Sequence, residues 1–350
     1  MNIPDRYKPL GDSMDGGMSA VFPYQDTILN RKVALKVVPP GPNFRRIQDE
    51  LIALFKMRSK HVVQVYDVFR DATSIGILQE FIDGNDLFCK TLVPADADGY
   101  LKVVWQIAAG ISEIHAAGLI HRDIKPNNMK IDHEGVLKIY DFGLSREDGP
   151  TAATNGFVGT HGFAAPELYL ADAKFTSGVD TYAFGATVLF FALRGLPGEL
   201  TSKPPVPISV NPFLSLPFTL NPEVSDILFK CLSHEERLRP QMKQVVEIVS
   251  KHLLFDKHRA LVVHSKKPYY LDKDKKSVKL GYGEIASVEI TYDGLDFKVT
   301  NLMGDVFINN ATANLGDSLP GASVLTLGGP ELKNRRAYIT FDLSNPEIVL

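Results

Sequence analysis

The sequence predicts an α+β chain whose elements come in three successive blocks. Strand-forming runs dominate up to about residue 95, and Val33–Val38 and Ser74–Ile82 are the clearest of them. A mainly helical block follows from Tyr100 to Leu254. From Phe255 onward, short strand runs alternate with Gly, Asp, Asn and Pro turns, which is the pattern of an all-β sandwich. We therefore expect a mixed α+β domain followed by a smaller all-β module.

Within the first block, residues 44–57 predict a helix because their apolar side chains recur at close to helical spacing. The helical block opens with residues 99–118 and closes with residues 242–254. Tyr182–Leu193 is the longest apolar stretch, which predicts a helix buried on all sides. Pro197–Pro222 is rich in proline and predicts an extended loop.

Composition limits the compartments and partners that we expect. The chain has 350 residues, 45% hydrophobic and 23% charged, with a formal charge of −3, so nothing favours nucleic acid or an anionic membrane. Cys89 and Cys231 form no disulfide framework or metal-ligand pattern. The first ten residues lack the apolar core of a signal peptide, and Tyr182–Leu193 is too short to span a bilayer. We expect a cytoplasmic protein.

Four short motifs occur in a fixed order. VALK ends at Lys36, His121–Asn128 reads HRDIKPNN, Asp141–Gly143 reads DFG, and Ala165–Glu167 reads APE. Together these motifs match the protein kinase signature in the required order. The chain over about residues 7–254 therefore resembles a complete Ser/Thr protein kinase of the eukaryotic type, most similar to the bacterial members of that family.

The resemblance implies a bilobal kinase fold and a domain plan. The kinase domain would cover residues 1–254, with a β-rich small lobe over about 1–82 and an α-helical large lobe over about 83–254. A short linker, 255–260, would lead to the sandwich at 261–350. The implied cofactors are ATP and Mg²⁺, and the implied partners are protein substrates, with no nucleic acid and no membrane.

The same resemblance assigns roles to five side chains. Asp123 would accept or orient the proton of the substrate hydroxyl, and Lys125 would touch the transferred phosphate. Asn128 and Asp141 would bind magnesium, since amide and carboxylate oxygens suit this hard cation. Lys36 would pair with the α- and β-phosphates.

A glutamate on the helix after Lys36 is expected to hold that lysine. Glu50 falls at the expected place, and its neighbour Asp49 is the competing choice. The remaining nucleotide-pocket positions implied by the resemblance are Val21, Ala34, Gln79, the hinge residues Glu80, Phe81 and Ile82, and Lys130. Lys130 stands where the family has an apolar floor for adenine, and its methylene stem can serve that purpose.

The phosphate-cradling loop departs from the family pattern. We align Met14-x-Gly16-x-x-Ser19-x-Val21, with Gly17 as an additional glycine. The alternative register starts at Leu10 and keeps Gly11 and Gly16, but it places Met18 where the valine is expected. Asp15 lies inside the loop. Its repulsion of one phosphate charge would be about 2 kcal/mol at about 8 Å and an effective dielectric of about 20. Rotation of its side chain into water and bound magnesium would remove most of that, so we expect a weakened loop and retained catalysis.

We expect the activity to be regulated through the activation segment, Asp141 to Glu167. Arg122 would read a phosphate on Thr151 or Thr154, which we expect to be autophosphorylated. The alternative is that both threonines are ordinary loop residues. Thr160 is expected to hydrogen-bond near Asp123 and Lys125.

Three further residues resemble structural parts of the family. Asp180 resembles the buried aspartate that holds the catalytic-loop backbone. Glu167 and Arg239 resemble the ion pair that stabilises the large lobe; the alternative is that they are surface charges.

The C-terminal module resembles a forkhead-associated (FHA) domain in its run of strands and in the LPGASVLTLGG turn. The phosphate-reading positions depart from that family: Tyr282 replaces the expected arginine, no histidine follows Ser287, and Asn309 remains. We therefore favour an interaction or autoregulatory role over phosphothreonine binding. The basic segment Lys266–Lys276 predicts a solvated hairpin. The alternatives to an active kinase are a pseudokinase scaffold and a phosphopeptide-binding adaptor.

Overall fold

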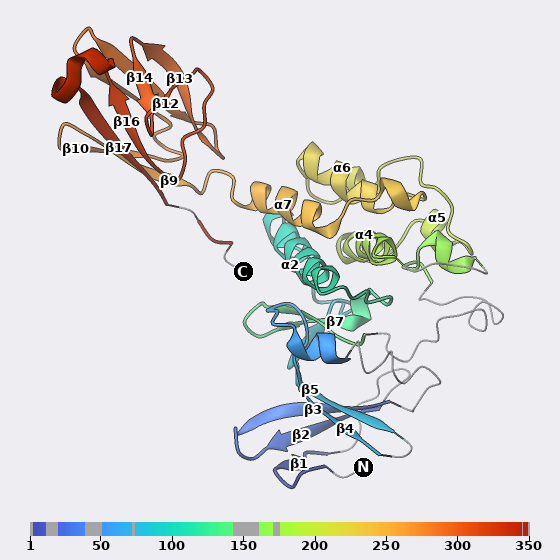
Figure 1. The fold of residues 1–350 in the computed structure, drawn as a ribbon. Helices are drawn as coiled ribbons and strands as arrows, with labels where there is room; N and C mark the ends of the chain where they lie inside the picture. Colours follow the sequence, from blue (N-terminus) through green and yellow to red (C-terminus); the bar gives the residue numbers. More distant parts are fainter. Residues whose placement is uncertain are drawn as a thin grey trace. The chain divides into compact units, whose positions relative to one another are not determined.

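The computed structural model of the chain describes residues 3–11, 20–38, 51–71, 74–142, 161–170, 176–344 and 346–348. It divides into two compact units between Val249 and Ser250 (Figure 1). Each unit has its own sheets and its own hydrophobic core.

The first unit begins with a five-stranded antiparallel sheet of order β1-β2-β3-β5-β4. The strands are β1 (Tyr7–Pro9), β2 (Ala20–Asp26), β3 (Arg31–Val38), β4 (Val65–Arg70) and β5 (Ile75–Glu80). Side chains alternate between faces along β3, so Val33 and Leu35 pack into one core with Leu78 while Lys36 lies on the opposite face. This register determines which face of the sheet carries the lysine.

Two segments connect this sheet to the rest of the unit. Residues 51–56 are helical, and Leu51 and Leu54 of that helix are buried, in agreement with the predicted helix. The chain then passes through His61, whose carbonyl accepts a hydrogen bond from Ile139 N at 2.9 Å. Ile139 O in turn accepts from Val63 N at 2.9 Å, so a strand of the second sheet is tied to the segment leading into β4.

The second sheet has three short antiparallel strands in the order β6-β7-β8. They are β6 (Gly84–Asp86), β7 (Met129–Asp132) and β8 (Leu137–Ile139). Met129, Leu137 and Ile139 are fully buried. The register places Asp86 opposite Lys130, and Lys130 opposite Lys138, so these three side chains share the other face of the sheet.

Helices form the remainder of the first unit (Figure 1). They are α2 (Ala97–Ala116), α4 (Gly178–Leu193), α5 (Gly198–Thr201), α6 (Pro222–Cys231) and α7 (Met242–Leu253), the last of which crosses into the second unit. α4 has 13 of its 16 residues buried, as its apolar run Tyr182–Leu193 predicts. None of the helices in the described ranges combines the length and the apolar character needed to cross a membrane.

The proline-rich stretch from Pro197 to Pro222 is not the continuous extended loop that the sequence predicts. It contains α5 and a 3₁₀ helix, Pro212–Ser215. Proline is favourable at the first position of a helix, and the side chain of Asn211 accepts a hydrogen bond from Phe213 N at 3.0 Å. The same residues that suggest a loop therefore start short helical turns.

The second unit is built from two sheets that share one core. The six-stranded sheet has the order β10-β9-β17-β16-β14-β15, and the three-stranded sheet has the order β11-β12-β13. The strands are β9 (Arg259–His264), β10 (Lys267–Leu271), β11 (Ser277–Tyr282), β12 (Ala286–Tyr292), β13 (Phe297–Met303), β14 (Val306–Ile308), β15 (Ala311–Thr312), β16 (Ala322–Leu327) and β17 (Ala337–Ser344). Buried side chains from both sheets form a single cluster, including Val288, Phe297 and Phe341. The predicted all-β content of this region is confirmed.

Candidate active site

The two charged residues that lie farthest apart in the predicted site meet between the two sheets of the first unit. Lys36 Nζ of β3 forms an ion pair with Asp141 Oδ1, although 105 positions separate them in the sequence. Lys36 is 6% exposed, whereas the carboxylate side chain of Asp141 is 42% exposed. Asp141 has a φ of +63°, a left-handed conformation that is uncommon for residues other than glycine. The backbone at this position is therefore held by its surroundings.

The second group of polar side chains comes from one short segment before β7. Asp123 Oδ2 accepts hydrogen bonds from Lys125 Nζ at 2.9 Å and from Asn128 Nδ2 at 2.9 Å. Asn128 Nδ2 also donates to Asp123 O at 2.8 Å. The 3₁₀ turn Pro126–Asn128 makes these contacts local, since it folds the segment back on itself. The buried carboxylate is thus held in one orientation by a cation and an amide.

Asp180 at the start of α4 holds the backbone that precedes Asp123. Its carboxylate is 1% exposed and accepts hydrogen bonds from His121 N at 2.7 Å and Arg122 N at 2.8 Å. His115 Nε2 lies 3.0 Å from the same carboxylate. Arg122 has a φ of +67°, so the two backbone bonds stabilise a conformation that a non-glycine residue rarely adopts.

His121 connects this segment to the strand that leads to Asp141. Its ring is fully buried, and this burial lowers the pKa of the imidazole, which favours the neutral form. In that form Nε2 donates to Tyr140 O at 3.0 Å while Nδ1 accepts from Asp123 N at 3.3 Å. A hydrogen-bonded chain thus runs from the backbone of Asp123 through the imidazole to the residue before Asp141.

The hinge end of β5 carries an ion pair that the sequence does not reveal. Lys138 Nζ of β8 lies 3.0 Å from Glu80 Oε1, and Glu80 Oε2 accepts from Gln64 N at 3.2 Å. Lys138 is separated from Glu80 by 58 positions, and its only local signal is its place in a short strand before the DFG motif. This pair fixes the side chain of a predicted hinge residue to the second sheet.

Tyr140 is a second residue that sequence reasoning missed. Its hydroxyl donates to Asn127 O at 2.6 Å, and the ammonium of Lys130 lies 5.9 Å from the centre of its ring. Burial raises the pKa of the phenol, so it remains a hydrogen-bond donor. Its signal is its position directly before the DFG motif.

The predicted structural ion pair has a bidentate geometry. Arg239 Nη1 lies 2.6 Å from Glu167 Oε1, and Arg239 Nη2 lies 2.8 Å from Glu167 Oε2. The same guanidinium donates to the carbonyls of Ser233, Gly178 and His234 at 2.8, 3.0 and 3.2 Å. The arginine side chain is 1% exposed, so this pair joins three segments inside the helical lobe and is not a surface contact.

Of the other predicted nucleotide-pocket residues, Lys130 lies in β7 of the second sheet, and the rest lie on or beside the first sheet. Val21 is paired with Lys36, Ala34 is paired with Gln79, and Ile82 follows β5 and is half-buried. The predictions that lie outside the described residues concern Gly16, Gly17, Ser19, Glu50, Thr151, Thr154 and Thr160.

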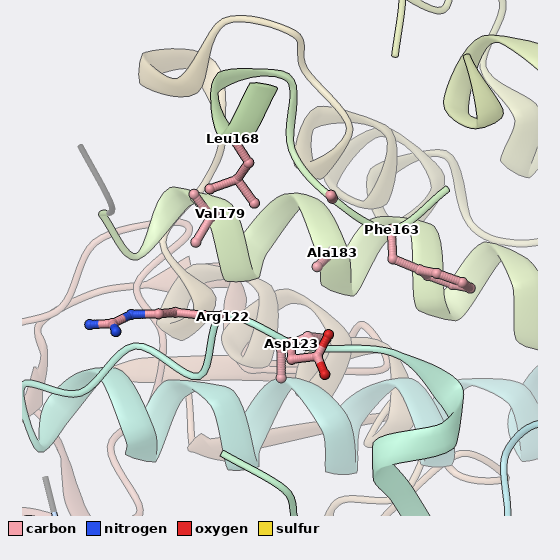
Figure 2. A pocket seen from close by; sticks show the side chains of 8 residues that line it. Arg122, Asp123, Phe163, Leu168, Val179 and Ala183 are labelled. Atoms are coloured by element: carbon pink, nitrogen blue, oxygen red, sulfur yellow. The ribbon is translucent and has the colours of Figure 1, made fainter. Parts of the chain in front are cut away.

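A pocket lies next to Asp123 on the side of the helical lobe. Figure 2 shows Arg122 and Asp123 on one wall, Phe163 and Leu168 on another, and Ala183 of α4 between them. Phe163 and Leu168 come from the residues just before and within the 3₁₀ helix Pro166–Tyr169. The segment around the APE motif is therefore adjacent to the candidate proton acceptor.

Comparison with known families decides the membership of the chain. The family model described as "Protein kinase domain" matches residues 7–249. The chain belongs to the protein kinase family. Its relatives include several proteins named as Ser/Thr kinases, so the predicted enzyme class, a phosphotransferase, is confirmed at the level of the family.

Three kinase relatives illustrate the similarity. The probable serine/threonine-protein kinase PknB of Lactococcus lactis is 31% identical over 240 residues, which is 64% of this chain and 37% of the relative. The serine/threonine-protein kinase 4 homolog B of Dictyostelium discoideum is 30% identical over 233 residues, covering 64% and 21% of the two chains. The drp72 kinase of Corynebacterium efficiens is 35% identical over 184 residues, covering 49% and 35%. The chain thus matches well under half the length of each of these relatives.

A solved structure supports the fold alone. The crystal structure of Rad53 residues 1–466 with AMP-PNP is similar with a TM-score of 0.56 at 21% identity, covering 69% of this chain and 64% of the other. The bilobal arrangement of a β-sheet lobe and a helical lobe is confirmed. The all-β unit after it is present, and the comparisons assign it no family.

Proposed function

We propose that the chain is an ATP- and magnesium-dependent Ser/Thr protein kinase that transfers the γ-phosphate to protein hydroxyls. The observation that carries the proposal is the meeting of Lys36 with Asp141 close to the segment that holds Asp123, Lys125 and Asn128. Phosphoryl transfer needs positioning and charge stabilisation more than covalent chemistry, and these are the properties that such a group of side chains supplies.

The donor set suits a magnesium–nucleotide complex. Asp141 presents a half-exposed carboxylate, and the amide nitrogen of Asn128 is engaged with Asp123, so the ligand atom that Asn128 would offer is Oδ1. Carboxylate and amide oxygens are ligands that Mg²⁺ accepts, together with phosphate oxygens. When bound, the ion would neutralise charge on the phosphates. Lys36 would add a second positive charge there, since its ammonium already lies at the carboxylate of Asp141.

Asp123 is the group that would receive the proton of the substrate hydroxyl. The hydroxyl oxygen forms a bond to the γ-phosphorus, the bond from that phosphorus to the bridging oxygen breaks, and ADP leaves. Lys125 and Asn128 hold the accepting carboxylate by bonds of 2.9 Å each, so it is oriented before the substrate arrives. Lys125 is also placed to stabilise negative charge on the phosphoryl group in transfer.

Phosphate incorporation tests this proposal. Wild-type protein would be incubated with magnesium and labelled ATP beside Asp123→Asn, Asp141→Ala and the control Asp98→Asn, which removes an exposed carboxylate from α2. We expect the wild type and the control to incorporate phosphate, with a fall of about 10²–10⁴-fold for Asp123→Asn. Equal background incorporation in all four proteins would instead favour a pseudokinase scaffold.

We further propose that the kinase phosphorylates its own activation segment at Thr151 or Thr154, and that Arg122 binds the resulting phosphate. Both threonines lie outside the described residues, so the proposal is supported by their place between the DFG and APE motifs. Phosphopeptide mapping after incubation with ATP tests it, and full activity with both threonines unmodified would rule it out.

For the second unit we propose an FHA-like module that contacts proteins without reading phosphothreonine. Asn309, the one phosphate-reading residue type that the sequence retains, uses its Oδ1 to accept a hydrogen bond from Val324 N at 2.9 Å. Tyr282, at the end of β11, provides no cation for a phosphate. A phosphothreonine peptide library applied to the full chain is expected to show no phosphate-dependent retention. Retention that phosphatase treatment abolishes would favour the adaptor alternative.

A further inference from the structure

Three phenylalanines from distant parts of the chain form a continuous row, which we call the aromatic row. Phe163 lies edge-on to Phe190 of α4, with ring centroids 5.9 Å apart. Phe190 stacks on Phe88, with centroids 5.3 Å apart and ring planes within 9°. Such edge-on and stacked pairs are favourable beyond the area that they bury. Phe88 nevertheless remains 50% exposed.

Arg194 holds the exposed end of this row in place. It follows α4 in a left-handed conformation with a φ of +57°. Its guanidinium donates to the carbonyls of Leu87 at 2.8 Å, Phe88 at 2.6 Å and Cys89 at 2.7 Å. The charge also lies 5.3 Å from the ring of Phe190. The backbone of Phe88 is therefore fixed, and the cation is directed at carbonyls.

The other end of the row is adjacent to the candidate proton acceptor. Phe163 and Asp123 line the same pocket beside Ala183 (Figure 2). Gly162, the residue before Phe163, has a φ of +86°, and a Cβ at this position would lie 2.8 Å from Leu196 Cδ1. The row therefore starts beside the residue that would receive the proton of the substrate hydroxyl and ends at an exposed, preorganised phenyl ring.

We propose that the aromatic row binds an apolar side chain, aromatic or branched aliphatic, that flanks the acceptor serine or threonine of a protein substrate. This inference rests on the proposed kinase function. The two centroid separations place Phe88 at most about 11 Å from Phe163, which an extended chain covers in three or four residues. A polypeptide that passes Phe163, beside the pocket that Asp123 lines, thus brings a side chain a few positions further along onto Phe88.

The rigidity of Phe88 suits this role. A ring that is stacked on one face and clamped through its backbone loses little conformational freedom when a partner covers the other face. Aromatic anchors of this kind commonly carry a large share of the binding energy at protein interfaces. A charged side chain at the same place would gain no hydrogen bond from the phenyl rings, and although Arg194 remains charged, its donors are directed at three carbonyls. The attraction of a cation to an exposed ring is weaker than the gain from removing an apolar side chain from water. The row should therefore prefer apolar residues to charged ones.

A set of Ser-acceptor peptides tests the inference with the full chain. In each peptide one position within four residues of the acceptor carries Phe, Leu, Lys or Asp. We expect at least one position at which Phe or Leu gives a kcat/KM about 10-fold or more above Lys and Asp. Phe88→Ser should reduce that preference to within about threefold, mainly through KM, whereas Phe88→Leu should retain it. Leu214→Ser is the matched control, since it removes an apolar side chain that is 71% exposed elsewhere in the same unit.

The outcomes separate the inference from the function on which it rests. A wild type that phosphorylates no peptide overturns the proposed function. A wild type that phosphorylates apolar and charged peptides equally well overturns the inference alone. If Phe88→Ser changes the oligomeric state and leaves the preference intact, the row binds a second copy of the chain and the inference is wrong. Phe88→Thr, with the same expected loss of preference, replaces Phe88→Ser if the serine variant does not fold.

Discussion

The carboxylate of Asp180 is the part of the candidate site whose removal we expect to lower both the stability and the activity of the chain. It is buried at 1% exposure and accepts two backbone hydrogen bonds and one contact from His115. Asp180→Asn keeps the shape of the side chain but replaces one oxygen with an amide group. That group is a donor, and it would face a backbone N–H that is also a donor.

The magnitude follows from the contacts. One of the two backbone donors, His121 N or Arg122 N, loses its acceptor, and the remaining bonds lose the benefit of a charged acceptor. Bonds to charged groups contribute about 1.5–3 kcal/mol each, and an unsatisfied buried donor costs about 1–3 kcal/mol. We therefore expect a loss of about 3–5 kcal/mol. For a unit of this size each kcal/mol lowers Tm by about 2–4 °C, so the shift should be about 6–20 °C.

The activity should fall as well, because the same bonds position the segment that carries Asp123. A misplacement of about 1 Å in a catalytic group is enough for a loss of about 10²-fold. The assay is thermal unfolding of the full chain, together with phosphate transfer measured at a temperature where the variant remains folded. Asp98→Asn removes the same charge from an exposed site on α2, 3.6 Å from Lys102, and should cost less than about 1 kcal/mol.

The reasoning would be refuted by an Asp180→Asn variant that unfolds within about 2 °C of the wild type and transfers phosphate at a rate within about threefold of it. That result would mean that other contacts hold the left-handed backbone at Arg122. A loss of stability without a loss of rate would refute only the positioning role, since the bonds would then stabilise the lobe without orienting Asp123.

Three further predictions concern other parts of the chain. Gly304→Ala should destabilise the second unit by about 3 kcal/mol or more in urea unfolding, because the residue has a φ of +67° and the new Cβ would lie 2.0 Å from the carbonyl oxygen of Ile285. Gly283→Ala is the control: its φ is +57°, no atom lies within 4 Å of the new Cβ, and the expected cost is about 1 kcal/mol. Burial lowers the pKa of His121 below 6.5, so at acidic pH the unfolded state binds more protons than the folded state. The free energy of unfolding should therefore fall as the pH drops below 6.5, by up to about 1.4 kcal/mol per pH unit. In urea titrations, His121→Gln should reduce this pH dependence, whereas His133→Gln, at an exposed position, should leave it unchanged. Arg239→Met leaves a partner carboxylate without its counter-charge and should lower stability by about 3–5 kcal/mol in thermal unfolding; an unchanged Tm would show that the pair is dispensable.

Local sequence patterns predict much of the fold, and the family motifs add long-range pairs such as Glu167 with Arg239. The apolar run of α4 identifies a buried helix without knowledge of its neighbours. The contacts among Asp123, Lys125 and Asn128 arise within six residues, so one motif and one turn account for them. The alternating runs after Phe255 likewise predict strands from their own pattern.

The features that the sequence does not disclose join residues about 60–110 positions apart. Lys138 finds Glu80 only because β8 is tied to the segment before β4. Arg194 belongs to none of the motifs, yet it binds three carbonyls that precede it by more than 100 positions. Which elements become neighbours is a property of the whole packing, and no local periodicity encodes it.

The left-handed backbone at Arg122 and Asp141 sets a trade-off for any attempt to make this chain heat-resistant. Glycine at either position would relieve backbone strain but would remove the guanidinium or the carboxylate. Laboratory evolution that selects only for heat resistance would therefore favour these glycine substitutions and yield inactive sequences. Gains compatible with activity have to come from elsewhere, such as the start of α4, where Ser177 makes no side-chain capping bond.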